Sequence, residues 1–284
     1  MLGVVVAAIA TGILGQDQKP VERRHSLALE VVRHESFASQ VLGNKRTVWV
    51  CLPPGYARES GRRFPVLYMH DGQNVFDGFT AFIPNQEWRA DETLKATVEA
   101  GLVEPLIIVG IDNGGVARGD EYLPTRAKMG KEEAGGKADL YTKFVVDEVM
   151  PFVNKTYRTK TGPGDTGLCG SSFGGVVTFH MGMARPDVFG KLAVVSPSLW
   201  WDGKVMVKRA EALTKKPWQR MWLDIGTREG NANLDTRKLR DIMLAKGWKQ
   251  PRDFTYYEDV DAQHNEVAWA GRFPSILQYL FPAR

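Results

Sequence analysis

Short apolar runs alternate along the chain with longer segments whose apolar residues recur at helical spacing. The runs, rich in β-branched residues, predict buried strands at 46–52, 64–70, 105–111, 166–170, 191–195, 222–226 and 253–257. The longer segments predict helices at 138–157, 176–184, 205–213, 235–246 and 266–280. We expect a kink or break at Pro151 and a helix end at Gly247. Repeated alternation of this kind predicts an α/β protein with a mostly parallel sheet covered by helices on both faces.

Composition agrees with one globular domain, and the length also allows two smaller ones. The chain has 284 residues, 43% of them hydrophobic, and shows neither an internal repeat nor a low-complexity tract. The net charge is +4, from 37 basic and 33 acidic residues. Because the basic residues are scattered along the sequence, nucleic-acid binding is not predicted. The two cysteines, Cys51 and Cys169, fall in predicted strands, and we expect buried, unpaired thiols. No cluster has metal-ligand spacing, so no metal is expected.

An uncharged apolar run opens the chain. It covers 2–15 and is too short to span a bilayer comfortably. Its length fits the apolar core of a signal peptide, although no Lys or Arg precedes it. We therefore expect a signal peptide over 1–15, cleavage near residues 10 to 17, a secreted or periplasmic protein, and no stable membrane span.

A Gly-x-Ser-x-Gly sequence at 170–174 is the most specific chemical signal. A strand-like segment precedes it and a helix-like segment follows it, which is the context of a nucleophile elbow centred on Ser172. Glycines suit the flanking positions because so tight a turn leaves little room for a Cβ atom. A serine needs a base and an orienting acid, and in this class of hydrolase the order along the chain is Ser, acid, His.

Chain order selects the base and narrows the choice of acid. His264 is far downstream of Ser172, whereas the other histidines precede the serine or lie on the helix that follows it. Glu229 comes just after the strand that ends at 226 and is our choice of acid, with Asp259 and Asp261 as alternatives. Asp224 lies inside that strand, where we expect a buried partner or solvent rather than the site.

Several motifs in order resemble the putative esterase family of α/β-hydrolases. They run HDGQNVFD from 70, WRADE from 88, RGDEYLP from 118, GSSFGG from 170 and SPSLWW from 196. The resemblance covers about 28–282 and extends to enterochelin-esterase-like, esterase-D-like and carbohydrate esterase family one enzymes. It implies the α/β-hydrolase fold and a serine esterase without cofactor, often exported. Ser172 and His264 carry over as the catalytic pair, and Glu229 matches a Gly-Thr-x-Glu pattern.

Further site residues follow from the position of the elbow. The amide of Phe173 and one amide after the strand ending at His70, from Gly72 or Gln73, are the expected oxyanion donors. Asp71 would bring negative charge near an oxyanion, so we expect it to point away and brace the loop. Residues expected to bind substrate at the mouth are Trp88, Trp200, Trp201 and Arg118.

The sequence thus predicts a carboxylic ester hydrolase that works through an acyl-enzyme. The resemblance implies that the substrate is a small-molecule ester or one linked to carbohydrate, with feruloyl or acetyl groups as examples. Alternatives are an acyltransferase of the mycolyltransferase type, a siderophore-ester hydrolase and a small-thioester hydrolase. No nucleic-acid partner is expected.

Overall fold

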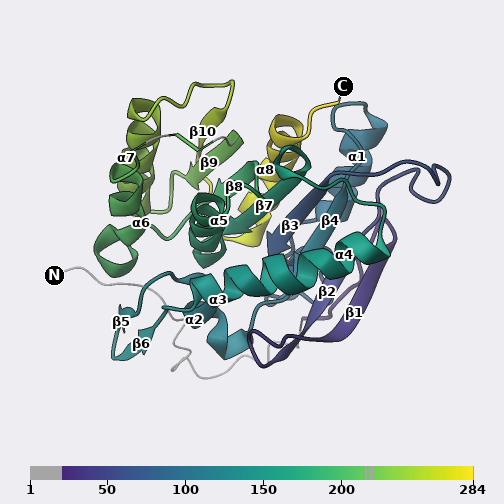
Figure 1. Cartoon of the computed structure of the whole chain (residues 1–284), viewed down its shortest axis with the longest axis horizontal. Helices are drawn as coiled ribbons and strands as arrows, with labels where there is room; N and C mark the ends of the chain where they lie inside the picture. Colours follow the sequence, from purple (N-terminus) through teal and green to yellow (C-terminus); the bar gives the residue numbers. More distant parts are fainter. Residues whose placement is uncertain (1–20, 215, 218–219, 284) are drawn as a thin grey trace.

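A single sheet organises the part of the chain that the computed structural model describes, which is 21–214, 216–217 and 220–283 (Figure 1). Its order is β1-β2-β4-β3-β7-β8-β9-β10, and from β4 to β10 all neighbours are parallel. The strands are β1 (Val31–Ala38), β2 (Lys45–Cys51), β3 (Val66–His70), β4 (Ile107–Ile111), β7 (Thr166–Ser171), β8 (Lys191–Val195), β9 (Arg220–Gly226) and β10 (Phe254–Asp259). A small hairpin, β5 (Ala127–Met129) and β6 (Glu132–Ala134), lies outside this sheet.

Helices cover both faces of the sheet, as the α/β-hydrolase prediction requires. They are α1 (Ala90–Glu99), α2 (Arg118–Tyr122), α3 (Ala138–Lys143), α4 (Met150–Thr156), α5 (Phe173–Ala184), α6 (Trp201–Glu211), α7 (Ala232–Ala245) and α8 (Glu266–Leu280). The side chains of α1 and α8 pack on one face, and those of α3, α4, α5, α6 and α7 pack on the other. The fold prediction is confirmed.

Alternation along the strands divides the core into two layers. In β2, Val48 and Val50 belong to the layer beneath α5, while Trp49 and Cys51 belong to the layer beneath α8. Successive side chains of a strand point to opposite faces, so a strand buried on both faces reads as a continuous apolar run. This explains why the central strands were visible in the sequence.

The expected break at Pro151 does not occur. Residues Phe144–Val149 form a π-helical segment between α3 and α4, and the helix continues through the proline. Pro151 is the second residue of α4 and directly follows the π-helical turns, whose hydrogen-bond spacing differs from that of an α-helix. The wider turns before it satisfy the backbone: the amide of Met150 donates to the carbonyl of Val145.

Backbone angles explain where one predicted helix begins and where another ends. Asp202–Lys204 have positive φ angles of 43°, 57° and 67°, so the regular part of α6 begins near Val205, where the sequence pattern begins. Gly247 has φ 95° just after α7, the left-handed conformation that glycine adopts at helix ends. Strand β1 was not predicted, and neither were α1 and α2.

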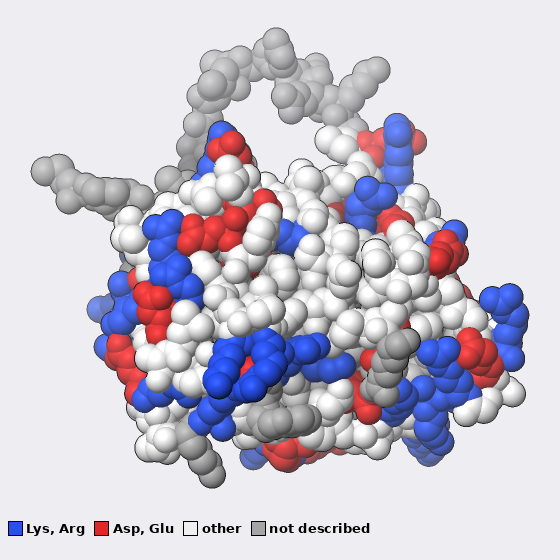
Figure 2. Space-filling model, turned by 90° about the horizontal axis from the view of Figure 1, so that it is seen from above, with Lys and Arg blue, Asp and Glu red and all other residues white. Residues whose placement is uncertain are grey.

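The surface in Figure 2 carries both signs of charge. Lys and Arg gather into one patch in the lower centre of that face, and acidic side chains are interspersed elsewhere.

The predicted signal peptide, 1–15, lies outside the described residues. Among the helices of the described part of the chain, none has the length and apolar character needed to cross a membrane.

Candidate active site

The carboxyl edge of the parallel sheet collects the predicted catalytic residues. Ser172 directly follows β7, Glu229 comes shortly after β9, and His264 follows β10. Strand register aligns these ends: Ser171 pairs with Val195, and Val195 pairs in turn with Asp224. Parallel strands end at the same edge, so loops from several strands converge there, as is usual for sites in open α/β sheets.

Ser172 occupies a strained turn between β7 and α5. Its φ is 60° and ψ is −123°, a region that residues with a side chain rarely adopt. Its amide donates to the carbonyl of Val195 at 3.1 Å, which ties the turn to the neighbouring strand. A Cβ at Gly170 would lie 2.6 Å from the carbonyl oxygen of Gly174. Glycine is therefore required at Gly170 for close approach, and it is the serine rather than its glycines that takes the unusual backbone angles.

Glu229 and His264 form a short polar contact at this edge. Nδ1 of His264 lies 2.6 Å from Oε2 of Glu229. Oε1 of Glu229 accepts from the hydroxyl of Ser196 at 2.6 Å and from the amide of Gly226 at 2.8 Å. Burial by itself raises the pKa of Glu229, but the hydrogen bond and charge of His264, with those two donors, hold the pKa below its usual value. An ionised carboxylate can only accept, so Nδ1 carries the ring proton and Nε2 is left as a base.

The hydroxyl of Ser172 lies 3.3 Å from the hydroxyl of Ser198. Among the described residues no hydrogen bond joins Ser172 to His264. Bonds between a nucleophile and its base often form fully only in the complex with substrate, so this geometry is compatible with the pairing. The amide of Ser198 also donates to the carbonyl of Ser172 at 3.2 Å, which fixes the two serines side by side.

The alternative acids have other partners. Asp261 pairs with Arg228 on the surface, and Asp259 lies 3.8 Å from Nε of Arg272. Asp224 is fully buried against Arg272, as its position inside a strand indicated. The expected contact between Glu229 and His264 is present, and Glu229 is the carboxylate that reaches the ring.

The other histidines are occupied elsewhere. His70 is buried against the hydroxyl of Tyr141, and burial lowers its pKa to about 4. His180 contacts Asp139 through Nε2 and Arg209 through Nδ1, and burial lowers its pKa. The remaining two, near the amino end of the described chain, pair with Asp77 and Tyr157. The contacts of these four histidines therefore agree with the choice of His264 by its place in the chain.

The loop after β3 faces the start of α5. Its first turn is a 3₁₀ helix, Gly72–Asn74, and a Cβ at Gly72 would lie 2.7 Å from the backbone of Ile111. Phe173 is the first residue of α5, where helix geometry leaves the amide without an intrahelical acceptor. Such amides at a helix start favour negative charge. The assignment of the Phe173 amide, with that of Gly72 or Gln73, as oxyanion donors stays a prediction.

Asp71 braces this loop. Its φ is 58°, and its carboxylate accepts from Nε and Nη2 of Arg118 at 2.6 and 2.8 Å and from the side-chain amide of Asn113 at 2.7 Å. Burial by itself raises the pKa of Asp71, but the charge and hydrogen bonds of Arg118 outweigh burial and lower it. Asp71 therefore stays ionised while it holds the loop, as its sequence position suggested. Arg118, expected to bind substrate, has its Nε and Nη2 committed to Asp71.

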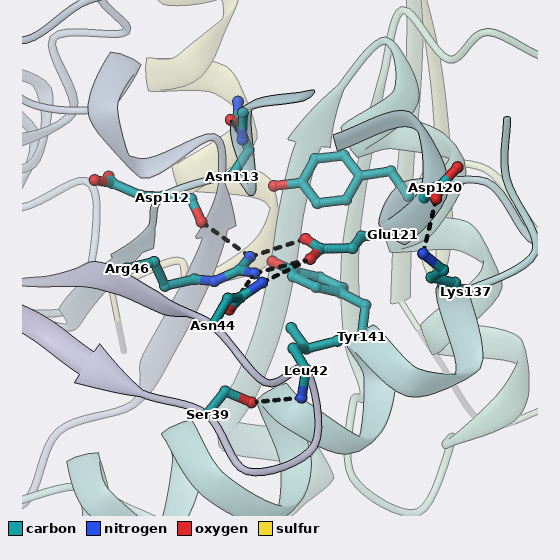
Figure 3. A network of polar contacts seen from close by, with 12 residues as sticks. Ser39, Leu42, Asn44, Arg46, Asp112, Asn113, Asp120, Glu121, Lys137 and Tyr141 are labelled. Carbon is teal, nitrogen blue, oxygen red and sulfur yellow. Dashed lines mark hydrogen bonds and ion pairs between the residues drawn. The ribbon is translucent and has the colours of Figure 1, made fainter. Parts of the chain in front are cut away.

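A buried ion pair anchors the short helix that carries Arg118 (Figure 3). Glu121 of α2 accepts from both terminal nitrogens of Arg46 at 2.9 Å, and Asn44 also contacts this pair. Both charged side chains are almost fully buried. A helix of one turn has little stability of its own, so this bidentate pair fixes its position relative to the β1–β2 turn. Because Arg118 of this helix holds Asp71, the position of Asp71 also depends on the pair of Glu121 and Arg46.

Two of the tryptophans predicted to bind substrate lie in the core instead. Trp88 is 2% exposed and packs against Trp269 and Phe273. Trp201 is 1% exposed, and its ring nitrogen donates to the carbonyl of Thr125. A buried ring of this size contributes to packing, so these two predictions are wrong.

Trp200 remains available at the surface. It is 42% exposed and lies beside Phe173, with 6.0 Å between ring centroids. Because Phe173 is the first residue after the elbow serine, Trp200 stays a candidate for contact with substrate.

Sequence reasoning assigned no role to three residues at the site. Ser196 and Ser198 directly follow β8, and Glu266 begins α8, two residues after His264. The side chain of Glu266 accepts from that of Asn74 at 2.9 Å, and burial raises its pKa. All three residues follow strand ends at the same edge of the sheet, and this position could have identified them from the sequence.

A metal centre finds no support in the described part of the chain, where no group of three or more His, Cys, Asp or Glu side chains could hold an ion. Cys51 and Cys169 are both buried and unpaired, as expected. The groups that the described site brings to one edge of the sheet include a hydroxyl, an imidazole and a carboxylate.

Comparisons with known proteins show the family of the chain. The model of the family described as "Putative esterase" matches residues 39–280. The uncharacterized protein YbbA of Bacillus subtilis is 24% identical over 87% of this chain and 96% of its own length. A siderophore enterobactin esterase of Emericella nidulans is 28% identical, over 53% of this chain and 52% of its own length. The crystal structure of the BES protein from Bacillus cereus superposes with a TM-score of 0.71 at 20% identity, covering 92% of this chain and 98% of that one. The chain belongs to the putative esterase family.

Proposed function

We propose that this carboxylic ester hydrolase works through Ser172 as nucleophile, His264 as general base and acid, and Glu229 as the acid that orients His264. The observation that carries the proposal is the 2.6 Å contact between Glu229 and His264 at the same sheet edge as a strained elbow serine. A backbone held in so unfavourable a conformation stores strain that is typical of functional sites.

The proposed reaction has two halves. The Ser172 hydroxyl attacks the ester carbonyl carbon while its proton passes to Nε2 of His264, and Glu229 stabilises the imidazolium that forms. Amides of Phe173 and of Gly72 or Gln73 stabilise the negative oxygen of the tetrahedral intermediate. The intermediate collapses, and the alcohol leaves with the proton from His264. Water then attacks the acyl-enzyme by the same route and releases the acid and free Ser172.

For the substrate, we propose an ester of an acyl group linked to carbohydrate, such as feruloyl or acetyl. The exposed ring of Trp200 beside Phe173 suits an aromatic acyl group or a sugar ring. A siderophore ester is the second candidate, because a relative that matches about half of this chain is named a siderophore enterobactin esterase. Hydrolysis of feruloyl, acetyl and siderophore esters by the pure protein, compared by kcat/KM, distinguishes the two.

Acyl transfer and thioester hydrolysis use the same proposed residues. Product analysis with an added alcohol tests transfer, because a transferase forms a new ester where a hydrolase forms the free acid. A small thioester in the same substrate panel tests the remaining alternative.

We also propose export, since the apolar run at 2–15 has signal-peptide length. Protein that stays in the cytoplasm of an exporting host would contradict export. Protein that still begins at Met1 in the medium or periplasm would contradict the expected cleavage near residues 10 to 17.

A serine-directed fluorophosphonate probe tests the catalytic assignment. We expect wild type to be labelled at Ser172, and Ser172→Ala to lose labelling and several orders of magnitude in kcat while it stays folded. The matched control is Ser171→Ala, the same truncation at the last residue of β7. It should keep most activity. An inactive Ser171→Ala beside an active Ser172→Ala would overturn the proposal.

A further inference from the structure

Ser196 lies directly behind the proposed acid and does not reach the surface. It is the first residue after β8, 1% exposed, with φ 41°, a conformation that a residue with a side chain rarely adopts. Its amide donates to Asp224, to the backbone carbonyl at 3.0 Å and to the carboxylate at 3.1 Å. The strained backbone is thus held by the neighbouring strand β9, and it turns the side chain toward Glu229.

Hydrogen bonding at the Ser196 hydroxyl determines where its proton lies. The oxygen accepts from Nε1 of Trp269 at 3.1 Å and from Nη2 of Arg272 at 3.1 Å. A hydroxyl has one proton and two acceptor sites, and both of these nitrogens can only donate. The acceptor capacity is therefore filled, and the one proton points to Oε1 of Glu229, 2.6 Å away. Together with the Gly226 amide, this leaves Oε2 as the oxygen that faces His264.

Trp269 contacts both Ser196 and the proposed base, His264. While its ring nitrogen donates to Ser196, its ring meets that of His264 edge to face, with centroids 5.1 Å apart and an angle of 87°. Trp88, which packs against Trp269, fixes the position of this ring from within the core. One buried unit therefore contacts both Glu229 and His264.

We propose that Ser196 is a positioning residue, whose hydroxyl, oriented by Trp269 and Arg272, holds Glu229 in the rotamer that aims Oε2 at His264. This inference rests on the catalytic triad proposed above and adds a residue to it. Ser196 acts through Glu229 and does not touch substrate. The other charged groups near Glu229 are Asp224 and Arg272, which pairs with Asp224 and lies 3.8 Å from Asp259, and substitution of Ser196 removes none of these charges.

Two substitutions separate the hydroxyl from the backbone conformation. Ser196→Ala removes the hydroxyl and keeps the strain, whereas Ser196→Gly removes both, because glycine accepts positive φ at little cost. If the hydroxyl positions Glu229, both variants lose about ten- to a hundred-fold in kcat, the range for loss of a hydrogen bond to a charged group. KM for a small acetyl ester should stay within about twofold, since the loss lies in the chemical step.

The matched control is Ser39→Ala. Ser39 is a similarly buried serine whose hydroxyl also donates to a carboxylate, that of Glu148, and accepts from a nitrogen, the amide of Leu42. It lies at the β1–β2 turn, where Figure 3 shows its contact with Leu42 apart from the pair of Arg46 and Glu121. Its truncation should lower the Tm by an amount similar to Ser196→Ala and leave kcat unchanged.

The pH profile provides a readout that a packing defect would not change. Without the Ser196 proton, Glu229 and His264 as a pair bind a proton more readily, so the acidic limb of kcat/KM moves to higher pH. A Ser196→Ala/Glu229→Gln double variant should lose little more than Glu229→Gln alone, because the two residues act as a unit.

The outcomes distinguish this inference from the triad proposal. If the probe labels Ser172 but Ser196→Ala and Ser196→Gly keep wild-type kcat and pH profile, the positioning role is wrong and the triad stands. If Ser196→Gly recovers the activity that Ser196→Ala loses, backbone strain and not the hydroxyl is responsible, which also contradicts the inference. If the probe fails to label Ser172, the triad proposal itself fails.

Discussion

Removing Arg118 tests the brace on the oxyanion loop. Arg118→Met keeps much of the side-chain volume but leaves the Asp71 carboxylate, almost buried, without its two strongest donors. Breaking a buried ion pair by removing one partner costs about 3–5 kcal/mol. Because the Arg118 side chain is 27% exposed, water can enter beside Asp71, and we expect about 2–3 kcal/mol instead. In a large domain this lowers the Tm by roughly 5–10 °C.

The loss should depend on pH in a defined direction. In the wild type the pKa of Asp71 is lowered, so its contribution to stability is present above the unfolded pKa and is lost as pH falls through the folded pKa. In Arg118→Met the charge of Arg118 no longer opposes burial and only the Asn113 hydrogen bond still does, so the pKa of Asp71 rises and the carboxyl takes up a proton at higher pH. Below both values the carboxyl is neutral in every state. Between the two pKa values only the variant binds the proton, so the destabilisation shrinks as pH falls through the raised pKa and should be smaller at about pH 4 than at about pH 7.

Thermal denaturation at both pH values is the assay, together with kcat on a chromogenic acetyl ester. We expect kcat to fall by up to about a hundred-fold, since the loop carries a proposed oxyanion donor. Arg126→Met is the control, because Arg126 pairs with Glu133 on the surface and its loss should leave the Tm nearly unchanged. A further variant, Asp71→Asn/Arg118→Met, should recover part of the stability. An equal loss of Tm at both pH values would refute the reasoning, because an unpaired carboxylate cannot then be its cause.

Three further predictions concern single side chains at the site. Glu229→Gln should lower kcat by a large factor, though less than Ser172→Ala, and an unchanged kcat would remove it from the triad. Gly72→Ala should destabilise the fold by about 1–3 kcal/mol and impair kcat, because its Cβ would meet the backbone of Ile111, whereas Gly61→Ala, with open space at its Cβ, should be neutral in both assays. Trp200→Ala should raise KM for an aromatic or sugar ester more than for an acetyl ester, and equal effects on both would mark it as packing.

Local constraints explain what could be predicted from the sequence. The elbow is a short segment in which Gly170 is required by contacts four residues away, so its sequence pattern is self-contained. Central strands are buried on both faces and read as apolar runs. Strand β1 pairs with β2 alone, mixes exposed and half-buried residues and is interrupted by a bulge between His34 and Phe37, so it leaves no such pattern.

Residue type alone does not show whether a side chain is buried or exposed, and this limited the prediction of the substrate pocket. Trp200 and Trp201 are adjacent in the sequence, yet one is exposed and the other is in the core. A tryptophan is suited to either place because it is large, apolar and carries a single donor. The role of Ser196 was hidden for a related reason: its partners Trp269 and Arg272 come from a helix more than seventy residues away.

Strand order explains why the proposed base stands where it does in the chain. Neighbouring strands lie about 4.8 Å apart, and β10 is three strands from β7, so the end of β10 is roughly 14 Å from the elbow. His264 is five residues beyond Asp259, the last residue of β10, and five extended residues span at most about 17 Å. Glu229, from the nearer strand β9, needs three residues beyond Gly226, and Ser196, from the adjacent strand β8, needs one. Loop length thus increases with distance from the nucleophile. The Ser, acid, His order is the order in which successive parallel strands are added on one side of β7.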